Sequence, residues 1–171
     1  LARRSFISAS VQVVSYRRDE ACSYRAEYCA GSLVSGPQPC AGTNGTSIMI
    51  HDMFFNAPQR KHALRSASEE YNRALDIVTK YALHYGPQGV SFSCKKTDQS
   101  RLDLQLTSTP NTSIVDTIRS LYGATIARDL IPLKEIQDEI LGYRAEGQFS
   151  NSNWISKKTT IICIINERLV K

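Results

Sequence analysis

One stretch of this sequence fits a single kind of secondary structure. From Tyr71 onward apolar side chains recur at intervals of three and four residues, which places them on one face of an α-helix. The residues on this face are Tyr71, Ala74, Leu75, Val78, Tyr81 and Ala82. Ser66 followed by Glu69 is typical of a capping box at a helix start, and Gly86-Pro87 is typical of a helix end. Because an amphipathic helix must bury its apolar face, the chain is expected to fold around a core.

Before this helix the sequence alternates between apolar and polar residues, as β-strands with one buried face do. Alternating stretches at residues 7–13 and 22–28 predict an antiparallel meander. A loop rich in glycine and proline is expected over residues 36–45. Ile48 and Ile50 are then expected to face inward on a further strand.

After the helix, the pattern predicts a hairpin and a short second helix. Alternation at residues 90–94 and 102–106 gives the two strands of the hairpin. Thr112 and Asp116 lie at capping distances from a helix that Gly123 ends. Further strands are expected at residues 130–133, 141–149 and 159–165, and the last is apolar on both faces, as a central strand is. The mixture predicts an α+β protein.

Composition places the chain among ordinary globular proteins. Its 171 residues are 42% hydrophobic and 22% charged, and the net charge of +5 permits an acidic partner without identifying one. The apolar run at residues 161–165 is far shorter than the roughly 20 residues that cross a bilayer, so no membrane is expected. Because the sequence starts at Leu1 rather than Met and stops at Lys171 within a strand-like pattern, we expect an internal fragment of a longer protein.

Residue spacing alone predicts neither a metal site nor a catalytic group. Five cysteines without a Cys-x-x-Cys pair favour reduced thiols in a nuclear or cytosolic protein. Two glycosylation sequons, at Asn44 and Asn111, favour a secreted protein more weakly. The three histidines lack metal-ligand spacing, and the glycines form no P-loop.

Three segments nevertheless resemble the MutL homologues of DNA mismatch repair, most closely the eukaryotic MutL-homologue-one type. The first segment contains Gly45-Thr46 and continues into Asp-Met-Phe-Phe-Asn-Ala-Pro-Gln-Arg at residues 52–60. It is similar to the family's Gly-Thr strand followed by Asp-Leu-Phe-Tyr-Asn-x-Pro-x-Arg. The other two segments are Ser-Asn-Ser-Asn-Trp-Ile-Ser-Lys-Lys at residues 150–158 and Ile-Asn-Glu-Arg-Leu-Val at residues 165–170. The second of the three argues against a topoisomerase or chaperone of the same ATPase group.

The resemblance implies an α/β sandwich of the gyrase, chaperone, histidine-kinase and MutL type. Residues 1–108 would be the later part of its ATP-binding domain. Residues 109–171 would be the earlier part of a transducer-type domain, similar to domain 2 of ribosomal protein S5. A polar, proline-containing stretch at residues 107–111 marks the same boundary independently.

The resemblance also implies two binding sites. Thr46, with Gly45 before it, would support adenine recognition through its hydroxyl and a bound water; without the resemblance, a strand-forming threonine after a turn glycine explains the pair. Arg168 would contact DNA, with Lys157 and Lys158 nearby, and such phosphate contacts are nonspecific and salt-dependent. The alternative for Arg168 is a solvated basic turn.

By the same resemblance, the intact protein would couple ATP binding and hydrolysis to clamp closure on DNA. It would use ATP and Mg, pair with another MutL homologue, work with MutS-type proteins and lie in the nucleus. The family's catalytic Glu and Asn, its Asp-x-Gly-x-Gly motif and its γ-phosphate lysine have no counterpart in these residues. This chain alone is therefore expected to bind no cofactor tightly and to hydrolyse no ATP. A non-catalytic DNA-binding or interaction module is the alternative.

Overall fold

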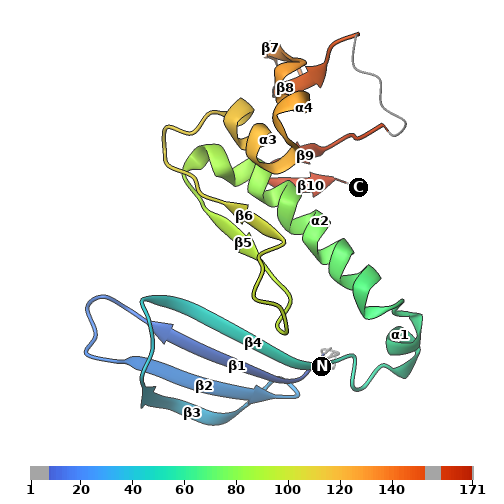
Figure 1. Ribbon diagram of the computed structural model, residues 1–171. Helices are drawn as coiled ribbons and strands as arrows, with labels where there is room; N and C mark the ends of the chain where they lie inside the picture. Colours follow the sequence, from blue (N-terminus) through green and yellow to red (C-terminus); the bar gives the residue numbers. More distant parts are fainter. Residues whose placement is uncertain (1–7, 153–158, 171) are drawn as a thin grey trace. The chain divides into compact units, whose positions relative to one another are not determined.

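The structure, a computed structural model, describes residues 8–152 and 159–170 (Figure 1). It divides into two compact units, Leu1–Ala67 and Ser68–Lys171. The boundary near residue 108, between an ATP-binding part and a transducer-type part, stays a prediction.

The first unit contains a four-stranded antiparallel sheet, which confirms the predicted meander. Its strands are β1 (Ser8–Tyr16), β2 (Ser23–Cys29), β3 (Ser32–Cys40) and β4 (Gly45–Met53), in the spatial order β3-β2-β1-β4. A short helix that the sequence patterns did not predict, α1 (Pro58–Ala63), follows β4. It begins with proline at its first turn, where a missing N–H costs nothing.

Two expectations for this unit are wrong. The loop expected from residue 36 begins only after Cys40, because β3 continues through Pro37 and Pro39. Strand β3 lies at the sheet edge, where a residue without an N–H removes few ladder hydrogen bonds. Ile48 and Ile50 do not face a core; they are 63% and 54% exposed, since a sheet face is buried only where another element covers it.

The second unit is built around the predicted helix, α2 (Ala67–Tyr85), which ends in a 3₁₀ turn at Gly86–Gln88. The predicted hairpin is confirmed as β5 (Phe92–Cys94) and β6 (Leu104–Leu106), which lie along the helix in Figure 1. Ala82 of α2 is fully buried against Leu104 and Leu106, which are 8% and 2% exposed. The apolar stripe of α2 and the inward residues of the hairpin therefore form the core of this unit.

The predicted short helix is α3 (Ile114–Tyr122), but its cap differs from the expected one. The N-cap is Ser113, whose hydroxyl accepts a hydrogen bond of 3.0 Å from the backbone N–H of Asp116. Thr112 instead accepts from the N–H of Thr109 in the preceding turn. Gly123, with φ +96°, ends α3 as predicted, and the unpredicted helix α4 (Ala124–Arg128) follows it.

The remaining strands form two separate hairpins. Strand β7 (Leu130–Asp138) pairs with β8 (Tyr143–Ser150), and β9 (Cys163–Ile165) pairs with β10 (Arg168–Val170). The expectation that residues 159–165 form a central strand is wrong. Within the described ranges β9 has one neighbour in a two-stranded sheet, and an apolar pattern on both faces does not by itself supply a second neighbouring strand.

Candidate functional site

The two residues predicted to face adenine lie at the start of strand β4. Gly45 has φ +120°, a conformation that side chains with a Cβ rarely adopt, while the space around its Cα is open. The glycine is therefore required by the backbone and not by crowding. Thr46 follows it as the register partner of Ser15 on β1, and the two hydroxyl oxygens are 3.0 Å apart in a hydrogen bond.

The register of the sheet places Thr46 on its apolar face. Residues directly opposite one another across antiparallel strands project to the same side. One row across the sheet is therefore Thr46, Ser15 and Tyr24. The next two rows, all on the same face, contain Val13, Ala26 and Ile48, then Val11, Tyr28 and Ile50.

The opposite face of the same sheet is largely polar, and it includes Ser10, Gln12, Glu27 and His51. The hydroxyl of Thr46 thus borders a broad apolar surface. Tyr24, in the same row, is hydrogen-bonded to Cys22, and this bond is the main reason why the pKa of its phenol is raised above the ordinary value. Tyr24 therefore presents a neutral hydroxyl group at neutral pH.

The predicted DNA-contact residue Arg168 follows a tight turn between β9 and β10. Asn166 and Glu167 occupy the turn with φ +48° and +64°, the left-handed geometry that two-residue hairpin turns favour. Arg168 pairs with Ile165, is exposed, and takes part in no ion pair among the described residues. Lys157 and Lys158 lie outside the residues that the structure describes.

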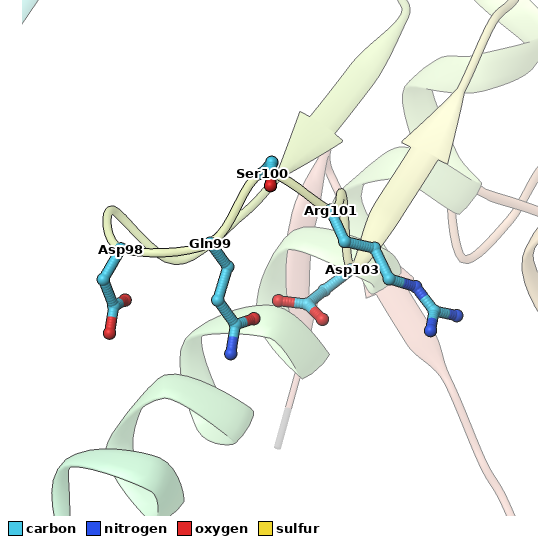
Figure 2. Close-up of a pocket in the computed structure, with 5 residues that line it drawn as sticks. All are labelled: Asp98, Gln99, Ser100, Arg101 and Asp103. Carbon is cyan, nitrogen blue, oxygen red and sulfur yellow. The ribbon is translucent and has the colours of Figure 1, made fainter.

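An open depression lies at the tip of the β5–β6 hairpin, and Figure 2 shows the residues that line it: Asp98, Gln99, Ser100, Arg101 and Asp103. The carboxylate of Asp103 is already engaged, because the hydroxyl of Tyr71 donates a hydrogen bond of 2.6 Å to it. That bond is the main cause of the strongly raised pKa of Tyr71. The ammonium of Lys96 lies 4.9 Å from the centre of the same ring. These contacts anchor the hairpin on α2.

A metal site and a membrane span would each require a recognisable feature in the described residues. No group of three or more His, Cys, Asp or Glu side chains is arranged there to hold a metal ion. All five cysteines are free thiols. None of the described helices combines the length and the apolar character needed to cross a bilayer.

Comparison with known proteins connects these features to one family. No family model matches the chain. The DNA mismatch repair protein MLH1 of Saccharomyces cerevisiae is 37% identical over 95% of this chain, and the alignment covers 21% of the yeast protein. The putative MutL protein homolog 1 of Schizosaccharomyces pombe is 39% identical over 95% of this chain and 25% of its own length. The chain belongs to the MutL family of DNA mismatch repair proteins.

Solved structures show that this MutL chain has the fold of MutL ATPase domains. The Aquifex aeolicus MutL ATPase domain complexed with ADP matches 98% of this chain and 60% of its own length, with a TM-score of 0.72 and 20% identity. The N-terminal domain of a DNA repair protein matches 96% of this chain and 52% of its own length, with a TM-score of 0.75 and 18% identity. The expected fold class, an α+β ATPase fold of the MutL type, is confirmed.

The MutL chain spans about a fifth to a quarter of the length of these curated relatives. Of the predicted site residues, Gly45 and Thr46 lie together on β4, and Arg168 is the first residue of β10 in the other unit. The roles of all three stay predictions. Sequence reasoning missed Ser15, which is 31 residues from its hydrogen-bond partner Thr46. A matched register of the two alternating stretches is the signal that could have paired them.

Proposed function

We propose that this chain forms part of the ATPase region of a mismatch repair MutL protein that couples ATP binding and hydrolysis to clamp closure on DNA. One observation carries the proposal: nearly the whole chain has the fold of a MutL ATPase domain, and one such domain was solved with ADP. Two relatives support it further: one at 37% identity is named a DNA mismatch repair protein, and one at 39% identity is named a putative MutL protein homolog.

In this proposal Thr46 contributes to the adenine side of the nucleotide site. A hydroxyl both donates and accepts hydrogen bonds, so Thr46 can hold a water that completes the hydrogen bonding of the purine edge. Gly45, with φ +120°, begins the strand, and the register of the sheet gives Thr46 its place on the apolar face. The catalytic acidic and amide groups of the family are not among these residues. ATP and Mg would therefore bind tightly only in the intact protein.

Nucleotide binding by the full-length protein tests this role. Thr46→Ala is expected to weaken ATP binding about tenfold, the effect of losing one or two hydrogen bonds at about 1 kcal/mol each. Thr46→Ser keeps the hydroxyl and should bind ATP almost normally. The isolated chain should show no ATPase activity above background. Turnover by the isolated chain that depends on Thr46, or ATP binding that ignores the Thr46→Ala change, would contradict the proposal.

The second candidate function is a non-catalytic DNA-binding module. It is favoured by Arg168, an exposed guanidinium without an ion pair in the described part of the chain, and by the net charge of +5. A phosphate contact of this kind positions the protein without reading sequence, so affinity should fall steeply with salt.

Titration of the chain with duplex DNA across a salt series tests this function. Arg168→Glu is expected to weaken binding and to reduce the salt slope by about one ion. Arg17→Glu makes the same charge change at an exposed site already paired with Asp19 and serves as the matched control. Binding without a salt slope, or equal effects of the two substitutions, would count against a role for Arg168.

The remaining parts of the proposal concern the intact protein. We propose pairing with another MutL homologue, cooperation with MutS-type mismatch recognition proteins and a nuclear location. The eukaryotic relatives support these assignments: those from Saccharomyces cerevisiae and Dictyostelium discoideum are named DNA mismatch repair proteins, and that from Schizosaccharomyces pombe is named a putative MutL protein homolog.

A further inference from the structure

The hydrogen bond between Ser15 and Thr46 links two strands at the position predicted to face adenine. Their hydroxyl oxygens are 3.0 Å apart, and either group can donate. The bond spans β1 and β4 at a register pair, so both side chains project from the same face of the sheet. Both groups are solvent-accessible rather than enclosed in a core.

A hydroxyl group carries one donor and two acceptor positions, and its hydrogen rotates to suit its neighbours. When Ser15 donates to Thr46, the hydroxyl hydrogen of Thr46 is directed away from Ser15. When Thr46 donates instead, only its acceptor positions remain open. The bond therefore restricts which hydrogen bonds Thr46 can offer to a water or to a base. Because threonine is β-branched and stiff at χ1, its hydroxyl oxygen keeps one position whichever of the two groups donates.

We propose that Ser15 is a positioning residue for adenine recognition: its hydrogen bond to Thr46 limits the donor and acceptor positions that the Thr46 hydroxyl leaves open. The inference rests on the proposed function of Thr46 and adds a second residue to that site. Ser15 does not touch the base; it acts through Thr46. The consequence is selectivity, since a hydroxyl with fewer open hydrogen-bonding positions distinguishes adenine from guanine, whose edges present different donors and acceptors.

Tyr24 and Ser10 carry hydroxyl groups on the same sheet but differ from Ser15 in their contacts. Tyr24 completes the row with Ser15 and Thr46, but its hydroxyl is engaged by Cys22. Ser10 also lies on β1, yet its register partner on β4 is His51, and both project from the opposite face. Ser10 is therefore a matched control: the same residue type on the same strand, on the face away from Thr46.

A double-mutant cycle in the full-length protein tests the inference. Affinities for ATP and GTP are measured for wild type, Ser15→Ala, Thr46→Ala and the double variant. Ser15→Ala is expected to weaken ATP binding about fivefold to tenfold, the effect of losing a hydrogen bond, with GTP binding unchanged. In the Thr46→Ala background the same substitution should change ATP affinity less than about twofold, because coupled residues are not additive.

Further variants separate positioning from structure. Ser10→Ala should leave the ATP-to-GTP ratio unchanged. Ser15→Thr keeps a hydroxyl and suits a strand, so it should restore both ATP affinity and selectivity. Thermal unfolding of each variant identifies any that fails to fold. If Ser15→Ala fails to fold, the nucleotide affinities of Ser15→Thr test the inference. A loss in Ser15→Thr equal to that in Ser15→Ala would overturn the inference.

The outcomes separate this inference from the function on which it rests. If Thr46→Ala leaves ATP affinity unchanged, the proposed role of Thr46 fails, and the inference fails with it. If Thr46→Ala weakens ATP binding while Ser15→Ala has no effect, or has the same effect with and without Thr46, the role of Thr46 stands and the positioning role of Ser15 is overturned. Equal losses for ATP and GTP in Ser15→Ala would also overturn it.

Discussion

Gly86 shows how close packing restricts the choice of residue at one position. A Cβ at this position would lie 2.8 Å from the methyl carbon of Thr117 and 3.0 Å from a methyl carbon of Leu106. Both neighbours are buried, at 0% and 2% exposure, and therefore have little room to move. The glycine that ends α2 is thus also the point where the helix terminus approaches α3 and the hairpin.

Gly86→Ala is expected to destabilise the chain by about 1–3 kcal/mol, the usual cost of overpacking a filled core. Chemical denaturation followed by circular dichroism measures the change. Gly147→Ala is the control, because a Cβ there would meet nothing within 4 Å and its φ is not in the left-handed region. A loss of stability at Gly147 as large as at Gly86 would contradict the packing argument.

Only those candidate site residues that lie within a recognisable sequence segment could be predicted. Gly45-Thr46 and Arg168 stand within short segments similar to those of the MutL family, so the resemblance identifies them residue by residue. Ser15 could not be found in this way, because its contact with Thr46 depends on the register of two strands 31 residues apart. The alternating pattern of a strand states which residues share a face, and not which partner lies opposite.

At the scale of whole elements, local signals succeeded where a single chain segment determines the structure. The stripe of α2 has the helical period, and the helix begins directly after Ser66 and ends directly before Gly86. The extent of β3 depends instead on its position at the sheet edge, which tolerates Pro37 and Pro39. For β9, apolar residues on both faces indicated burial, but strand neighbours are a property of the sheet.

Helix α3 provides a pH-dependent test of its cap. The hydroxyl of Ser113 donates 2.6 Å to the carboxylate of Asp116 and accepts from its backbone N–H. The bond to Ser113, followed by the charge of Arg119, lowers the pKa of Asp116. A lowered folded-state pKa stabilises the fold above the unfolded value of about 3.9, and this contribution is lost as pH falls through the folded-state pKa.

Ser113→Ala is therefore expected to destabilise the chain at pH 7 by about 1 kcal/mol, the usual cost of losing an N-cap. The difference from wild type should shrink when unfolding is measured at about pH 3, because the carboxylate is then increasingly protonated in both proteins. Ser100→Ala, in the exposed hairpin tip, should show no pH-dependent difference. A Ser113→Ala effect that grows as pH falls would contradict the assigned hydrogen bond.

At the scale of the whole molecule, the exposed apolar face of the β1–β4 sheet is the feature with the broadest consequence. Ile48 and Ile50 share this face with Val11 and Val13, and both isoleucines are more than half exposed. Large exposed apolar patches are interaction surfaces or aggregation sites in soluble proteins. The net charge of +5 opposes association only weakly, since salt screens it.

The isolated chain is therefore expected to self-associate as its concentration rises, as measured by sedimentation velocity. Replacing both Ile48 and Ile50 by Thr keeps strand propensity, removes apolar area, and should weaken association by about tenfold or more. Met49→Thr is the matched control: Met49 is 48% exposed on the same strand but projects from the polar face. Two outcomes would show that the apolar face does not drive association. One is a chain that stays monomeric at every concentration, and the other is a Met49 substitution as effective as the isoleucine pair.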